Sequence, residues 1–85
     1  MNKIDPNYFE CGKLYRNDLF QDLPLWQNSN GYGPYGTLHQ DEIFLCLNSE
    51  IAKNGWSVLL EILTSSGEKK WLLVQNFEYD ELIKL

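Results

Sequence analysis

The sequence predicts a small all-β barrel made of one domain, and three observations support this. Several short segments place apolar residues at alternate positions, which is the repeat of a strand with one buried face. Turn-forming residues separate these segments at intervals of about eight to twelve residues, as in small sandwiches and barrels. The 85 residues are 44% hydrophobic and 14% aromatic, which is enough apolar material for one folded core.

The clearest strand signals lie in the second half of the chain. Residues 42–47 and 56–63 are apolar and β-compatible, and Asn54-Gly55 between them predicts a turn. Within 56–63 apolar residues occupy both faces of the expected strand. Residues 64–67 predict a hairpin loop with Gly67 at a position that needs a positive φ, and residues 70–74 predict the partner strand.

The first half predicts weaker elements. Residues 12–16 and 23–26 are expected to be short strands, and Pro24 restricts the second to an edge or a strand start. Residues 28–36 contain three glycines and a proline and are predicted to be a loop, after which 37–38 are extended.

The two ends of the chain complete the expected domain. Residues 1–10 are interpreted as an N-terminal arm docked by its aromatics, and residues 11–85 as the barrel. A single helical turn is expected over 76–81 and a closing strand over 82–85, and the barrel as a whole is expected to have about five short strands. A short Greek-key or OB-type barrel has similar strand spacing and is the alternative fold.

Charge and cysteine usage limit the classes of partner and compartment. The formal net charge of −5 disfavours phosphate backbones and anionic membranes. No apolar run approaches the ~20 residues of a membrane helix, and the first residues do not form a secretory signal, so a cytoplasmic location is expected. Cys11 and Cys46 are therefore interpreted as reduced thiols, with Cys46 in the core; a disulfide between them is the alternative in an oxidising compartment.

No pattern of catalytic or ligand-binding residues is present. His39, the one histidine, lies in a polar turn, and no cysteine is near it in sequence to form a nucleophile and base pair. Cys11, His39 and Cys46 are too few and too scattered for a metal site. Gly31, Gly33 and Gly36 do not form a phosphate-binding loop. The sequence therefore predicts a protein that is not an enzyme and takes no cofactor or metal.

From residue 23 to about residue 82 the order of signals resembles that of a bacterial SH3-like (SH3b-type) domain. The features that carry the resemblance are Leu23 to Trp26 before a glycine-rich and proline-rich loop, Gly36-Thr37-Leu38 before strand 42–47, Asn54-Gly55-Trp56 opening a strand, Gly67 in a hairpin, and Trp71 beginning the return strand. The resemblance implies a five-stranded SH3-like barrel with a short helical turn before the last strand. Two positions depart from the family pattern: Lys70 stands where a glycine is usual, and Trp26 where a basic residue is usual.

The aromatic residues indicate a binding function. Tyr32 and Tyr35 lie on a loop flanked by glycines, and large amphipathic rings on loops are favoured in binding surfaces. The SH3-like arrangement would bring them together with Trp56 and Tyr79 to line one groove. Asp41 and Glu42 would form an acidic rim, which favours a basic or proline-rich protein or peptide. The alternative is that both tyrosines fold back within their loop.

The leading hypothesis is a non-catalytic adaptor module, and the SH3-like resemblance implies a small accessory protein of a bacterial or phage assembly. The main alternative is a self-assembling structural component, for example of a phage particle, in which exposed aromatics and open edges pair chain to chain. Less favoured hypotheses are a cell-wall peptide-binding module, as in secreted members of the resembled family, and an acidic mimic of nucleic acid.

Overall fold

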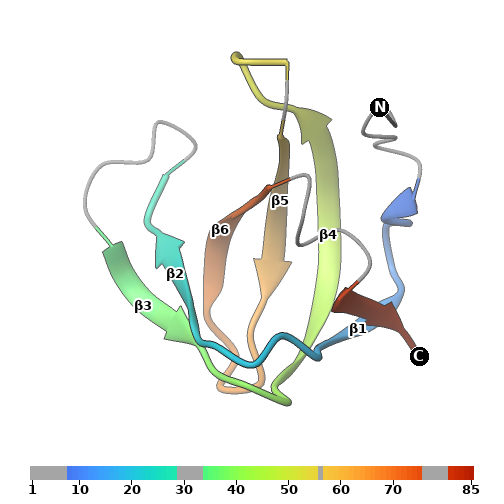
Figure 1. The fold of residues 1–85 in the computed structure, drawn as a ribbon, viewed down its shortest axis with the longest axis vertical. Coiled ribbons are helices and arrows are strands. Elements are labelled where there is room, and N and C mark those ends of the chain that lie inside the picture. Colours follow the sequence, from blue (N-terminus) through green and yellow to red (C-terminus); the bar gives the residue numbers. More distant parts are fainter. Residues whose placement is uncertain (1–7, 29–33, 56, 76–80) are drawn as a thin grey trace.

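The computed structural model describes residues 8–28, 34–55, 57–75 and 81–85, without the side chains of residues 34 and 35. In these residues seven strands form a single antiparallel sheet (Figure 1), so the all-β prediction is confirmed. The strands are β1 (Leu14–Asn17), β2 (Leu23–Trp26), β3 (Pro34–Leu38), β4 (Ile43–Ile51), β5 (Val58–Leu63), β6 (Lys69–Val74) and β7 (Leu82–Lys84). Their order in the sheet is β3-β2-β6-β5-β4-β1-β7.

The sheet curls into a half-barrel around its inner face (Figure 1). Strands β6, β5 and β4 form the centre, while β2 and β3 flank them on one side and β1 and β7 on the other. The loops 18–22, 39–42 and 64–68 lie together at what we call the lower end of the sheet. Residues 52–55 and Ser57, after β4, lie at the opposite, upper end.

The prediction of five strands was wrong, because the structure contains seven in the described residues. The region predicted as loop 28–36 includes the start of β3, despite Pro34 and Gly36. Residues 34–38 pair with β2, where Gly36 lies opposite Leu25. Pairing to a neighbouring strand therefore overrides the weak strand propensity of proline and glycine.

Strand β4 is also longer than the predicted segment 42–47. It continues to Ile51 through Asn48, Ser49 and Glu50, which pair with β5. The register shifts between Cys46 and Asn48, and a bulge of this kind bends a strand and increases its twist. Polar residues extend this strand because they complete the hydrogen-bond ladder of β5.

The predicted turns are supported by backbone geometry. Gly67 in the β5–β6 hairpin has φ of 86° and Gly55 in the β4–β5 loop has φ of 73°, which is the left-handed region that glycine enters without strain. The predicted helical turn cannot be compared in the same way, since residues 76–80 lie outside the described part.

The inner face of the sheet forms the hydrophobic core. Alternate residues of β5 and β6 point inward, and the same face receives the rings of Tyr15 and Phe44, which stack with centroids 5.9 Å apart. The buried apolar residues are Phe9, Tyr15, Leu23, Leu25, Leu38, Phe44, Cys46, Val58, Leu60, Ile62, Leu72, Val74 and Leu82.

The described end of the predicted N-terminal arm is part of this core. Phe9 is 2% exposed and contacts Tyr15, with ring centroids 5.4 Å apart. The Tyr15 hydroxyl donates to the Tyr8 carbonyl and accepts from the Glu10 amide at 2.7 Å. These hydrogen bonds satisfy a buried phenol, whose pKa is raised by burial.

Candidate interaction surface

Most of the aromatic residues predicted to line a groove lie outside the described residues. This is so for Tyr32, Trp56 and Tyr79, while Tyr35 belongs to β3 and only its backbone is described. Gly55 and Ser57, which flank Trp56 in the sequence, are described, and they lie at the upper end of the sheet. The aromatic groove thus stays a prediction.

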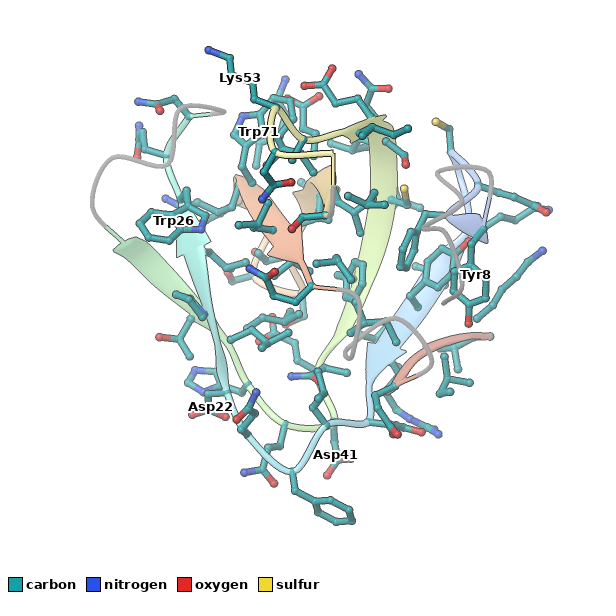
Figure 2. All side chains as sticks on the ribbon, turned by 45° about the horizontal axis from the view of Figure 1, so that its top comes forward. Tyr8, Asp22, Trp26, Asp41, Lys53 and Trp71 are labelled. Atoms are coloured by element: carbon teal, nitrogen blue, oxygen red, sulfur yellow. The ribbon has the colours of Figure 1, made fainter. Side chains whose placement is uncertain are left out.

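The predicted acidic rim lies at the lower end. Asp41 and Glu42 precede β4, whereas Gly55 and Ser57 follow it, and nine extended residues span roughly 25 Å. The structure therefore does not bring these two carboxylates to the described neighbours of Trp56. Figure 2 shows the same separation, with Asp41 and Asp22 at one end and Lys53 at the other.

Glu42 connects two loops of the lower end. Its carboxylate accepts hydrogen bonds from the His39 amide at 3.0 Å and from the Ser65 hydroxyl at 2.8 Å. Asp41 adopts a positive φ of 64° in the same turn, a conformation that aspartate tolerates better than most residues. The geometry gives Glu42 a structural role in joining the turn 39–42 to the β5–β6 hairpin.

Asn17 organises the third loop of the lower end. Its side chain is fully buried, and its amide nitrogen lies 3.1 Å from the His39 carbonyl and 3.3 Å from both the Leu38 and Gln21 carbonyls. Its side-chain oxygen accepts from the Leu19 amide at 3.1 Å. The loop 18–22 is thereby tied to the neighbouring turn.

This organised loop presents an exposed aromatic ring. Phe20 is 97% exposed, although its neighbour Leu19 packs against the core. The loop is also tied across to the next turn, because the Gln40 amide donates to the Asp22 carboxylate at 3.0 Å. Phe20 is thus the most exposed large apolar side chain of the described residues.

The lower end is acidic as well. Loops 18–22 and 39–42 each carry two carboxylates, loop 64–68 carries one, and none of the three contains lysine or arginine. Arg16 pairs with Asp18, and this ion pair lowers the pKa of the Asp18 carboxyl. At the upper end, Glu50 and Lys53 are the charged residues that line the hollow described below.

The outer face of the sheet is apolar too. The register of β5 with its neighbours places Leu59 opposite Leu73 and Leu63 opposite Lys69, with Glu61 opposite Trp71. Trp71 is in turn opposite Trp26 of β2. The partly buried apolar residues on this face are Trp26, Leu45, Leu47, Leu59, Leu63, Trp71, Leu73 and Ile83, and the exposed ones are Leu14 and Ile43.

Three acidic and two basic residues lie on or beside the outer face, and Glu50, opposite Leu59, is one of the acids. Lys69 approaches Glu61 at 3.9 Å, and the Arg16 guanidinium binds the Asp18 carboxylate, with the second N–O contact at 3.0 Å. Sheets with one face in water normally carry polar residues on that face. The outer face therefore carries more apolar side chains than the solvent-facing side of a sheet usually does.

A hollow of about 370 Å³ opens at the upper end of the outer face. It is lined by Leu59 and Leu73, by Glu50 and Ile51 at the end of β4, and by the loop residues 52–54. Pockets of this size that combine apolar walls with a few polar groups accept side chains or small ligands.

The histidine and the two cysteines lie in different surroundings. His39 and Asp22 are 3.5 Å apart, but both side chains are largely exposed. Burial raises the pKa of the Cys46 thiol to about 11, so this cysteine stays protonated and unreactive at neutral pH. Cys11 is exposed, both cysteines are free, and the described residues contain no group of three or more metal-ligating side chains.

Comparisons with known proteins assign no class: no protein-family profile, no characterised protein and no solved structure matches the chain. Among the described residues no helix is long and apolar enough to span a membrane.

Sequence reasoning missed the outer face and Phe20. The signal for the outer face was present, because residues 56–63 are apolar at both odd and even positions. That pattern could equally belong to a strand covered on both sides. The exposure of Phe20 had no such signal, since an aromatic residue in a short loop is as often buried as exposed.

Proposed function

We propose that this protein is a non-catalytic module that binds another protein through the outer face of its sheet. The observation that carries the proposal is the apolar row on the outer side of β5 and β6, formed by Leu59, Leu63, Trp71 and Leu73. Burying apolar surface is the main driving force of protein association. Aromatic and aliphatic anchors next to a hollow are typical of the centre of an interface.

The proposed fold for this module is the SH3-like barrel. Support comes from the consecutive hairpins β4–β5 and β5–β6 and from the short last strand β7, which pairs with the first strand β1. The aromatic groove at the upper end would be a second surface of the same module. Substitutions at Tyr35 and Trp56 would remove the contribution of this groove to partner binding without changing the outer face.

The test compares partner capture by four forms of the purified chain in lysate of the source organism. These are the native chain, the double variant Leu59→Gln with Leu73→Gln, the variant Trp56→Ala, and the control Lys84→Gln. Lys84 lies opposite the core residue Tyr15, on the other side of the sheet from Leu59 and Leu73, so it controls for a substitution away from the outer face.

We expect the outer-face double variant to keep the native urea midpoint and to lose the captured protein, while Lys84→Gln retains it. Capture that survives the double variant but is lost with Trp56→Ala would move the binding site to the groove. A double variant that no longer folds would mean that Leu59 and Leu73 belong to the core.

A further inference from the structure

We propose that Cys11 and Cys46 are a disulfide-forming pair, in which oxidation by a low-molecular-weight disulfide joins the turn before β1 to strand β4. Both cysteines are free in this structure. The pair does not involve the apolar row of β5 and β6, so this inference is independent of the proposed function.

A tight turn brings Cys11 to β4. The Lys13 amide donates to the Glu10 carbonyl at 3.3 Å, so Cys11 and Gly12 are the two central residues of a turn. Gly12 has φ of 84°, which is the left-handed conformation that the third position of a type II turn requires. The turn thereby leads the chain into its contact with Cys46.

Two backbone hydrogen bonds hold this turn against Cys46. The Gly12 amide donates to the Cys46 carbonyl at 2.8 Å, and the Cys46 amide donates to the Lys13 carbonyl at 3.0 Å. Two residues of one strand opposite one residue of its neighbour form a β-bulge. This bulge continues the pairing of β1 with β4, in which Leu14 lies opposite Leu45.

The bulge sets the backbone distance between the two cysteines. Standard backbone dimensions around the hydrogen bond from Gly12 to Cys46 put the Cα atoms of Cys11 and Cys46 about 4.5–6 Å apart. Disulfides in proteins join Cα atoms that are about 4.4–6.8 Å apart. The backbone spacing therefore meets the distance requirement for a disulfide.

The surroundings of the two thiols give them different roles. Cys46 is fully buried, and this burial, together with the charge of a Cys11 thiolate, raises the pKa of Cys46 to about 11. Cys11 is exposed. A reagent in solution therefore reaches Cys11 first, whereas Cys46 reacts only with a sulfur that is held beside it.

Oxidation by a low-molecular-weight disulfide takes two exchange steps. The Cys11 thiolate attacks one sulfur of the reagent, the S–S bond of the reagent breaks, and one thiol is released. Cys46 then gives up its proton and attacks the Cys11 sulfur of the mixed disulfide, which releases the second thiol. The two cysteines lose two electrons and two protons, and the reagent takes them up as it becomes two thiols.

The bond would constrain the unfolded chain more than the folded one. It would close a loop that includes β1, β2 and β3. In the folded chain the turn already lies against Cys46, whereas in the unfolded chain the two cysteines are free to separate. We therefore expect the oxidised chain to be the more stable form.

Equilibration of the full chain with reduced and oxidised glutathione tests the inference. Remaining thiols are alkylated, and the intact mass of the monomer then counts them. We expect a monomer that carries neither an alkyl group nor glutathione. The effective concentration of the pair should be higher in native buffer than in urea by about tenfold, which corresponds to about 1.4 kcal/mol of added stability and a higher urea midpoint of the oxidised chain.

Three variants provide the controls. Cys11→Ser should keep the urea midpoint of the reduced native chain and form no bond within the monomer. Gly12→Ala and Gly67→Ala are a matched pair, because these glycines have φ of 84° and 86° and neither has an atom within 4 Å of the added Cβ. Only Gly12→Ala is expected to lower the effective concentration severalfold, since Gly67 lies between β5 and β6. Equal values for both glycine variants would overturn the role of the turn.

Two results would overturn the disulfide itself. One is a native chain that forms only a mixed disulfide at Cys11 or dimers linked through Cys11. The other is an effective concentration in native buffer that is no higher than in urea, because the fold would then not favour the pair. Neither result bears on the outer face, which the capture experiment with Leu59→Gln and Leu73→Gln tests separately.

Discussion

The inner and outer faces of β5 carry nearly the same kind of side chain and have different surroundings. Leu60 and Ile62 point inward and are fully buried, while Leu59 and Leu63 on the outer side are only partly buried. The residue types at these positions do not explain why one pair is buried and the other is not. The curl of the sheet explains it, because other core side chains cover the inner face. No core residue covers the outer face.

The comparison shows which leucines hold the fold and which are available to a partner. Fully burying an apolar side chain contributes about 1.5–3 kcal/mol, and a partly exposed one contributes correspondingly less. An outer residue of this kind gains the remaining part of that free energy when another surface covers it.

The largest expected effect is the difference between two neighbouring substitutions in β5. Leu60→Ala removes a fully buried side chain and is expected to lower the free energy of unfolding by about 2–5 kcal/mol. Leu59→Ala, one residue away on the outer face, is expected to cost less than about 1 kcal/mol. Urea unfolding of dilute protein measures both, and equal losses would show that the two faces are buried alike.

A smaller loss in the free energy of unfolding is expected for substitution of Asn17, the buried asparagine on the inner face. Asn17→Ala leaves the buried Leu38 carbonyl without its side-chain donor and releases the Leu19 amide, so we expect a loss of about 1–3 kcal/mol. The matched control is Asn48→Ala, on the exposed outer side of β4.

Hydrogen exchange separates the local effect of Asn17→Ala from the global one. The Leu19 amide should exchange faster than the loss in global stability explains, because its acceptor is gone. An unchanged rate at Leu19 would show that loop 18–22 does not depend on Asn17, and that Phe20 is presented by other contacts.

The smallest effect is expected for the ion pair beside the outer face. The pKa of Asp18 is lowered by Arg16, so the pair stabilises the fold at pH values above the ordinary aspartate pKa of about 3.9. The contribution is lost as the pH falls through the lowered pKa, where Asp18 becomes protonated in the folded state too. Both side chains are substantially exposed, so the effect at neutral pH is small.

The measurement is the urea midpoint of Arg16→Gln relative to the native chain at pH 6 and at pH 2.5. A small difference at pH 6 should become smaller at pH 2.5. A difference that is as large at pH 2.5 as at pH 6 would assign the role of Arg16 to packing of its aliphatic stem.

Several features could be predicted from particular residues. The apolar alternation of 58–63, the Asn54-Gly55 turn and Gly67 at a positive φ are local, and each was found where expected. Cys46 was placed in the core from its apolar neighbours, and it is fully buried. These predictions succeed because side-chain period and backbone φ depend on a few consecutive residues.

Other features depended on contacts between distant residues. β3 forms because residues 34–38 pair with β2, and β4 reaches Ile51 because β5 offers a complete ladder. Asn17 became a central hydrogen-bonding residue only when the turn after β3 was placed beside β1. Asp41 and Glu42 were expected at the rim of a groove, but β4 carries them away from the described neighbours of Trp56.

The sequence by itself determined that the chain forms an all-β domain with an apolar core, because the period of two and the turn residues are local properties. Only the tertiary structure decided which of two apolar faces becomes the core, since a strand with leucines on both faces does not itself indicate which face is buried. The curl of the sheet made that choice, and it left the other face and Phe20 partly or wholly exposed.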